Sequence, residues 1–176
     1  MKIKLIVEDS WGVPFFPIVI ERLKVANLVN RNLIIPKPKH VPADCNGKLD
    51  EILKMVNNTC DRIIIVLDAD GPQNYGKRYD RAYSHIPNNM TTPVKIILAE
   101  YEIEEWICYS KDIKWKHNKP SDELKLKLKF GYIKSSLPKY ATELDFDKLV
   151  KNCKSFKAFL DALTSASENI EKNNCQ

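Results

Sequence analysis

Short aliphatic runs alternate along this chain with segments in which apolar residues recur at helical spacing. The clearest run is Ile63–Leu67, in which every residue is aliphatic and which leads directly into Asp68. Such a run is typical of a strand in a parallel sheet that is covered by helices on both faces. Similar patterns predict strands at Ile3–Glu8 and Pro93–Leu98, and we expect a short second strand at Asn32–Ile35.

The segments between these runs predict helices. Apolar residues at helical spacing follow Pro14 and, further on, Gly47 or Asn46; two more helices are expected from Tyr75 to about residue 86 and from Glu100 to about residue 109. The resulting order βαβαβαβα predicts an α/β fold, Rossmann-like, with a mostly parallel four-stranded sheet and helices on both faces.

The alternation of strand and helix patterns ends after Lys111. A segment that begins at Pro120 fits either a helix or a short strand, whereas Asp145–Val150 and Ser155–Leu163 predict two helices. We therefore divide the chain into an α/β domain, residues 1–110, and a small, mostly helical C-terminal extension, residues 111–176, packed on it.

Composition narrows the class of protein only moderately. A chain of 176 residues with 44% hydrophobic and 29% charged residues suits one compact globular protein. The net charge of +5 fits a polyanionic partner such as DNA or RNA, and it fits a lysine-rich solubilising surface equally well. Five cysteines without a CxxC pair favour neither a disulfide framework nor a zinc site, and no apolar run approaches the ~18 residues of a membrane helix. We expect a cytoplasmic protein without a membrane segment.

Acidic residues follow three of the predicted strands. Glu8 ends the first strand, Asp68 and Asp70 follow the central one, and Glu100, Glu102, Glu104 and Glu105 follow the last. Neighbouring parallel strands lie ~4.8 Å apart and their carboxyl ends meet at one edge, so these carboxylates are expected close together. Crowded carboxylates repel one another, and a divalent cation relieves that repulsion. Oxygen ligands suit Mg²⁺ or Mn²⁺, ions that support phosphodiester hydrolysis.

This pattern resembles the Toprim domain, in which a Glu after the first strand is combined with an Asp-x-Asp after a later one. The resemblance rests on Leu5-Ile6-Val7-Glu8, on Asp68-Ala69-Asp70-Gly71 and on Glu102-Ile103-Glu104-Glu105-Trp106, which is similar to a segment of small Toprim proteins related to the overcoming-lysogenization-defect nucleases. The residues 140–160 resemble the closing helical segment of those proteins. One departure is Asp9-Ser10, which stands where many Toprim proteins place a Gly directly after the Glu.

The resemblance implies a role for each acidic residue. Glu8 would be the general acid/base or a metal ligand, and Asp68 and Asp70 would hold the metal ion, Mg²⁺ or Mn²⁺. Glu102 is the first choice for a further ligand, with Glu104 and Glu105 behind it: a helix starting at Glu100 would pair residue 102 with 105, whereas the motif pairs it with 104. By analogy with a lysine of these nucleases, Lys134 and Lys139 are the candidates for stabilising transition-state charge.

The function implied is a metal-dependent nuclease that acts on DNA or RNA. Two alternatives stay open: a non-catalytic nucleic-acid-binding or regulatory subunit that works with an ATPase partner, and a phosphatase of the haloacid-dehalogenase type, in which Asp68 would be the nucleophile. A homodimer is also compatible with the sequence. The acidic residues have a structural explanation as well, because Asp and Glu cap helices and form turns. Trp106 is expected to be a core residue.

Overall fold

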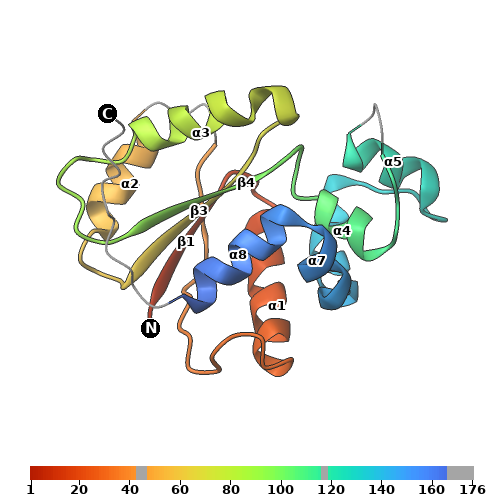
Figure 1. Cartoon of the computed structure of the whole chain (residues 1–176), viewed down its shortest axis with the longest axis horizontal. Helices are drawn as coiled ribbons and strands as arrows, with labels where there is room; N and C mark the ends of the chain where they lie inside the picture. Colours follow the sequence, from red (N-terminus) through yellow and green to blue (C-terminus); the bar gives the residue numbers. More distant parts are fainter. Residues whose placement is uncertain (43–46, 116–118, 166–176) are drawn as a thin grey trace.

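The computed structural model of the protein describes residues 1–42, 47–115 and 119–165, and it has an α/β fold (Figure 1). The strands are β1 (Ile3–Val7), β2 (Lys39–His40), β3 (Arg62–Asp68) and β4 (Val94–Ala99). The helices are α1 (Gly12–Val25), α2 (Lys48–Val56), α3 (Tyr75–Ser84), α4 (Glu105–Ser110), α5 (Pro120–Lys127), α6 (Leu137–Tyr140), α7 (Phe146–Asn152) and α8 (Lys154–Thr164). Short 3₁₀ turns are η1 (Pro72–Asn74), η2 (Lys134–Ser136) and η3 (Ala141–Glu143).

The four strands form one parallel sheet in the order β2-β1-β3-β4. Ile3 to Val7 of β1 pair with Arg62 to Val66 of β3, so β1 ends beside the last residues of β3. This confirms the predicted α/β class and the predicted four-stranded parallel sheet flanked by helices. It also brings Glu8 and Asp68 together at the carboxyl ends of the strands.

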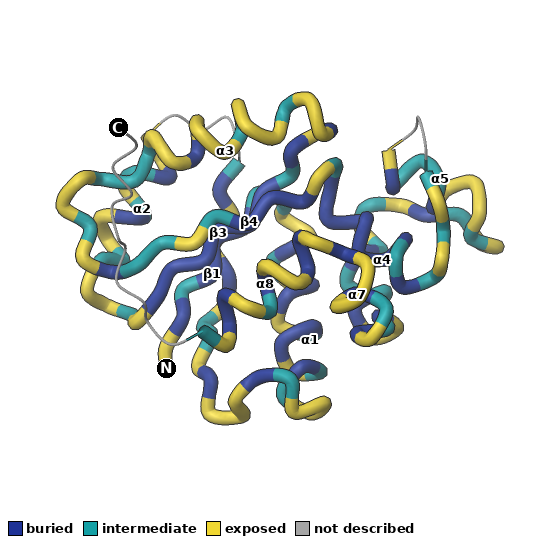
Figure 2. Tube along the Cα trace, in the orientation of Figure 1, coloured by how far each residue is buried: buried dark blue, intermediate teal, exposed yellow. Residues whose placement is uncertain are grey.

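Helices cover both faces of the sheet, as the doubly apolar pattern of β3 predicts (Figure 1). Ile63, Ile65 and Leu67 point into a hydrophobic cluster with α2 and α3, whereas Ile64 and Val66 point into a larger cluster with α1, α4, α7 and α8. Every residue of β3 before Asp68 is buried, and the buried positions in Figure 2 follow the central strands. The sheet is therefore a rigid platform for the residues that follow it.

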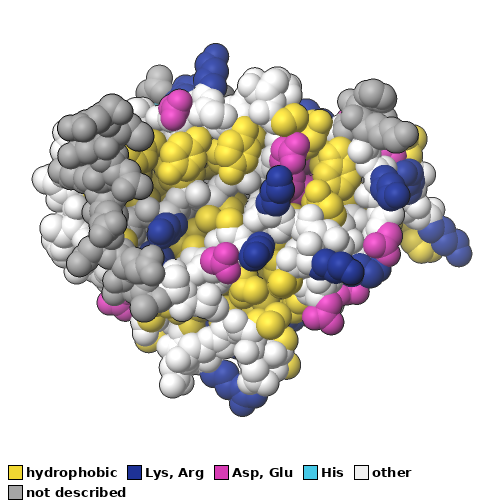
Figure 3. Space-filling view, in the orientation of Figure 1, with side chains coloured by type: hydrophobic (Ala, Val, Ile, Leu, Met, Phe, Trp, Pro, Cys, Tyr) yellow, Lys and Arg dark blue, Asp and Glu magenta, His cyan; other side chains and the backbone are white. Residues whose placement is uncertain are grey.

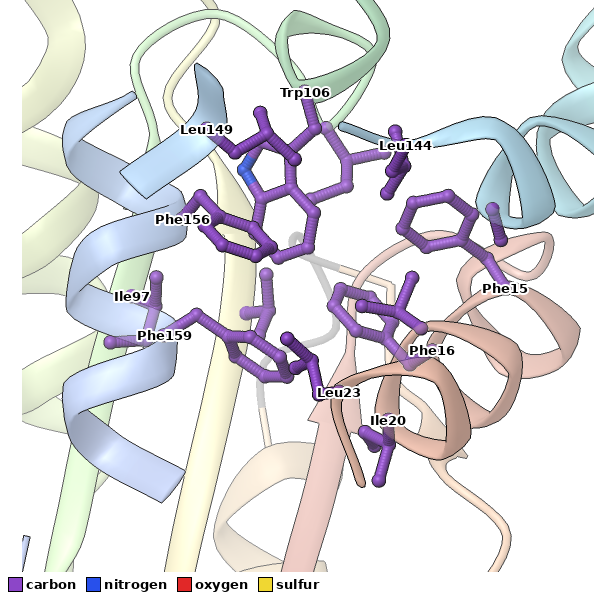
Figure 4. Packing of buried hydrophobic residues seen from close by; sticks show 14 of the residues in the cluster. Phe15, Phe16, Ile20, Leu23, Ile97, Trp106, Leu144, Leu149, Phe156 and Phe159 are labelled. Carbon is purple, nitrogen blue, oxygen red and sulfur yellow. The ribbon is translucent and has the colours of Figure 1, made fainter. Parts of the chain in front are cut away.

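The larger cluster is built around Trp106, which is fully buried, as expected (Figure 4). Its ring lies 5.7 Å from that of Phe16 on α1, and 4.9 Å and 5.4 Å from those of Phe156 and Phe159 on α8. The Trp106 indole N–H donates to Ser155 Oγ at 2.9 Å. The C-terminal helices thus complete the core that covers one face of the sheet.

The second strand is not where the sequence pattern placed it. Asn32–Ile35 was expected to form this strand, but only Ile34 bridges to Lys2, and β2 is instead formed by Lys39–His40, which pair with Ile6 and Val7. Leu33 points into the larger hydrophobic cluster. Pro36 follows at once and has no N–H to donate to a ladder, so the chain leaves the sheet edge and rejoins it further on.

The helix expected from Glu100 also begins later, at Glu105. Backbone N–H groups of Ala69, Asp70 and Gly71 donate to carbonyls of residues 99–101, so this segment continues beside the loop after β3 and cannot coil. The segment that begins at Pro120, for which the sequence allowed a helix or a short strand, forms a helix, α5. None of the described helices has the length and apolar character needed to cross a membrane.

Candidate acidic site at the ends of β1 and β3

The ends of β1 and β3 are joined through the Glu8 side chain. The Glu8 N–H donates to the Val66 carbonyl at 3.1 Å and continues the ladder by one residue. In return, Glu8 Oε2 accepts the backbone N–H of Asp68 at 2.9 Å. The side chain of Glu8 is therefore held against the backbone at the point where the Asp-x-Asp motif begins.

Asp68 and Asp70 take different positions after β3. Asp68 Oδ1 accepts the backbone N–H of Ile103 at 3.0 Å, which anchors the segment after β4 to the motif. Asp70 has a φ of +57° and Gly71 a φ of +119°, so the chain turns sharply. Asp tolerates this left-handed conformation better than most residues. The turn places Asp70 on the outer side of the site, with its side chain about half exposed.

Arg78 on α3 connects Glu8 and Asp70. Its Nη2 lies 2.9 Å from Glu8 Oε1 and 3.1 Å from Asp70 Oδ2, and its Nε donates to the Asp68 carbonyl at 3.0 Å. One guanidinium thus contacts all three members of the Glu plus Asp-x-Asp pattern. It has the geometry of an internal counter-ion for the carboxylates.

Two lysines also pair with carboxylates of the site. Lys119, directly before α5, lies 2.8 Å from Asp70 Oδ1. Lys134 lies 2.9 Å from Glu104 Oε1 and 2.7 Å from Asp9 Oδ2. Glu104 is fully buried and also accepts the Tyr132 hydroxyl at 2.7 Å. The analogy that pointed to Lys134 therefore selects a residue that does lie among the acidic side chains.

The protonation equilibria of these groups are coupled. Burial raises the pKa of Asp68 well above its ordinary value, and repulsion from Glu104, Glu8 and Glu102 adds to the rise, opposed by Lys134. Burial also raises the pKa of Glu8 and the pKa of Glu104. For Lys134, burial alone would lower the pKa, but Glu104 and Asp68 outweigh it and raise the pKa, so this lysine stays protonated.

The other predicted site residues, Glu102, Glu105 and Lys139, lie in different surroundings. Glu102 precedes α4, is buried, and accepts the backbone N–H of Ser121 through Oε1. Glu105 contacts α8 instead, where its Oε1 accepts the Ser155 hydroxyl. The helical pairing of residue 102 with 105 is wrong because Glu102 lies outside the helix. Lys139 is exposed, and its backbone carbonyl accepts the Thr142 hydroxyl.

The donor chemistry of the site fits a hard divalent cation, because all of the side chains concerned are carboxylates whose mutual repulsion is felt at Asp68. Within the described ranges, however, no three His, Cys, Asp or Glu side chains are grouped closely enough to form a ready-made metal site. Arg78, Lys119 and Lys134 pair with Glu8, Asp70 and Glu104 in this arrangement, so each of these carboxylates has a counter-ion. A bound metal ion would take over part of that neutralisation.

Sequence reasoning missed Arg78, Lys119, Asp9 and Tyr132. Arg78 carries a weak signal, since it is a basic residue one turn into the helix that follows the Asp-x-Asp motif. Asp9 was noted only as a departure from the Toprim pattern, yet it holds Lys134. Lys119 and Tyr132 belong to no motif recognised in the sequence, so no local signal marks them.

Comparisons with protein-family models, with curated proteins and with solved structures found no match.

Proposed function

We propose that the protein is a metal-dependent nuclease of the Toprim type, related to the overcoming-lysogenization-defect nucleases, that hydrolyses phosphodiester bonds in DNA or RNA. The observation that carries this proposal is the Arg78 bridge, which collects Glu8 and Asp70 at the ends of two adjacent parallel strands, with Asp68 between them. An α/β fold binds its ligands at the carboxyl ends of its strands, and these carboxylates lie there. The three basic side chains beside them suit a phosphate group.

In this proposal Asp68, Asp70 and Glu8 would hold Mg²⁺ or Mn²⁺, with Glu102 and Glu104 behind them. The ion would supply Lewis-acid polarisation of the phosphate and a more acidic bound water. Arg78 and Lys119 reach Asp70 from exposed or half-buried positions, so they can exchange a carboxylate partner for a phosphate oxygen. Lys134 stays protonated between Asp9 and Glu104, where a positive charge can stabilise an anionic transition state.

The test is hydrolysis of plasmid DNA, single-stranded DNA and structured RNA with Mn²⁺, comparing the protein with Asp68→Asn and Asp70→Asn. Asn keeps an oxygen acceptor for the Ile103 N–H and tolerates the left-handed backbone of residue 70. Both variants should fold, lose Mn²⁺ affinity in calorimetric titration and lose cleavage. Asp147→Asn, an exposed carboxylate on α7, is the matched control and should cleave normally. Unchanged cleavage by both site variants would exclude this metal centre.

The second candidate is a non-catalytic nucleic-acid-binding or regulatory subunit, working with an ATPase partner. The saturation of Glu8, Asp70 and Glu104 by Arg78, Lys119 and Lys134 favours it, because such a network stabilises the fold without a metal. In that case the purified protein would bind nucleic acid and show no hydrolysis with any divalent ion. Hydrolysis that appears only after an ATPase is added would support the partnership.

A further inference from the structure

Helix α3 exposes a row of tyrosines that no role in the acidic site explains. Tyr75, Tyr79 and Tyr83 are spaced four residues apart, which places them along one flank of the helix. Their exposed fractions are 43%, 40% and 59%. The rings of Tyr79 and Tyr83 are nearly parallel, with 6.3 Å between centroids and 12° between planes. Large aromatic side chains in an exposed row are typical of a binding surface.

The first tyrosine of this row lines a groove of about 600 Å³ along the edge of the sheet. Its floor is the outer strand β4, from Ile96 to Leu98, and its opposite wall is α8 with Lys154 and Ala158. On the face shown in Figure 3, hydrophobic side chains, tyrosines included, gather along α3 and β4. The groove thus has Tyr75 on one side and Lys154 on the other.

One lysine, Lys154 on α8, lines the groove, Lys157 follows it on the same helix, and Lys95 on β4 directly precedes the residues of the floor. All three are exposed, and the structure pairs none of them with a carboxylate among the residues it describes. Two carboxylates also line the groove, Glu105, which is buried, and Glu100, which is exposed. A polyanionic ligand would therefore place its phosphates toward the lysines and its uncharged rings toward the tyrosines.

One end of the groove lies beside the acidic site. Pro72, which lines it, is the second residue after Asp70, and the Gly71 N–H donates to the Glu100 carbonyl at 2.9 Å. Arg78, on the same helix as the tyrosines, contacts Glu8 and Asp70. A chain that runs along α3 would thus pass from the tyrosine row to the acidic residues.

We infer that the groove between α3 and α8 binds a single-stranded nucleic acid, with bases stacked on Tyr75, Tyr79 and Tyr83 and the backbone facing Lys154. Bases of any sequence stack on exposed aromatic rings, and a basic wall follows the phosphates; together these are the two components of sequence-tolerant single-strand binding. Paired bases in a duplex present no free ring faces, so a double strand cannot use the tyrosines. The inference takes its ligand class from the proposed nuclease function and narrows the substrate to single strands.

Binding without hydrolysis tests this inference. Fluorescence anisotropy with a labelled oligothymidylate of about 20 nucleotides, in EDTA, should show tighter binding than to a duplex of the same length. Tyr79→Ala/Tyr83→Ala should weaken single-strand binding roughly tenfold or more, whereas Tyr79→Phe/Tyr83→Phe keeps the rings and should bind normally. Lys154→Glu should weaken binding and reduce its dependence on salt. Phe130→Ala, which removes another highly exposed ring, is the control and should change nothing.

The inference is overturned if the alanine pair binds as the parent does, if duplex and single strand bind equally, or if neither binds. It is also overturned if sedimentation shows a dimer that the alanine pair converts to a monomer, because the tyrosines would then face a second copy. Cleavage with Mn²⁺ is measured separately. Tyrosine-dependent binding without cleavage would refute the proposed nuclease function and leave the single-strand binding site standing. Cleavage that the alanine pair leaves unchanged would refute the proposed binding site and leave the nuclease function standing.

Discussion

Glu8 accepts the backbone N–H of Asp68 at 2.9 Å, although the two residues are 60 positions apart in the chain. This contact follows from the parallel pairing of β1 with β3, in which Val7, the last residue of β1, is opposite Val66, so that Glu8 lies beside the last residues of β3. It fixes the position of the first acidic residue relative to the Asp-x-Asp turn before any cation is considered. The contacts of Arg78, Lys119 and Lys134 then determine how the charge of the site is balanced.

Replacement of Arg78 by Ala should make the protein respond more strongly to divalent ions. Without the guanidinium, Glu8 and Asp70 lack their shared counter-ion, and we expect the free energy of unfolding in EDTA to fall by about 1–3 kcal/mol. Added Mg²⁺ should raise the melting temperature of this variant more than that of the parent, because binding to the native state stabilises it. Lys77→Ala, on the exposed side of α3, is the control. Equal Mg²⁺ responses would contradict the role assigned to Arg78.

Lys134 and Lys139 should differ sharply in their effect on stability. Lys134→Ala leaves the fully buried Glu104 without its cation, for which we expect a loss of about 3 kcal/mol. Lys139→Ala should change stability by less than about 0.5 kcal/mol, because the lysine is exposed. Urea unfolding of both variants measures the difference. Adding Glu104→Gln to Lys134→Ala should recover part of the loss, and failure to do so would show that the two side chains are not coupled.

Glu105 should make stability depend on pH in the neutral range. Burial is the main cause that raises its pKa to about 7 in the folded protein, from an ordinary value of 4.5. A raised carboxyl pKa means that the folded state holds the proton more tightly, so this stabilisation is complete below pH 4.5 and is lost as the pH rises through 7. Across this pH range the contribution of Glu105 to the free energy of unfolding changes by about 3 kcal/mol.

The variant Glu105→Gln tests this dependence directly. Gln keeps an oxygen to accept the Ser155 hydroxyl and carries no ionisable proton, so its unfolding free energy should vary less between pH 5 and pH 8. Chemical denaturation at several pH values supplies the measurement, and parallel pH profiles for the two proteins would be inconsistent with a buried, neutral Glu105.

The aromatic cluster should make the C-terminal helices unfold together with the sheet. Phe16 of α1 contacts both Trp106 and Phe159, so Phe16→Ala is expected to cost about 3–5 kcal/mol. Tryptophan fluorescence and far-UV circular dichroism should report one coincident transition for the parent. Phe130→Ala, at a 93% exposed position, should have almost no effect. Two separated transitions would instead indicate that the C-terminal region unfolds as an independent unit.

Much of the fold follows from local sequence pattern. The central strand was predictable because a doubly buried strand needs a continuous aliphatic run, as at Ile63–Leu67. The flanking strands β1 and β4 were predictable because each is aliphatic apart from one lysine. The second strand was not, because Lys39–His40 are exposed and polar, and they join the sheet only because β1 offers an open edge there. The start of α4 was misplaced for a similar reason: the backbone of residues 99–101 is bonded to the loop after β3.

For the candidate site, the sequence by itself determined which carboxylates stand at strand ends, since that depends only on where aliphatic runs stop. It also determined that Glu8, Asp68 and Asp70 share one edge, given a parallel sheet. The tertiary structure alone decided their partners. Arg78, Lys119 and Lys134 come from three separate segments of the chain, and Glu105 contacts Ser155 whereas Glu104 contacts Lys134. Such choices depend on packing between distant segments, which no local pattern records.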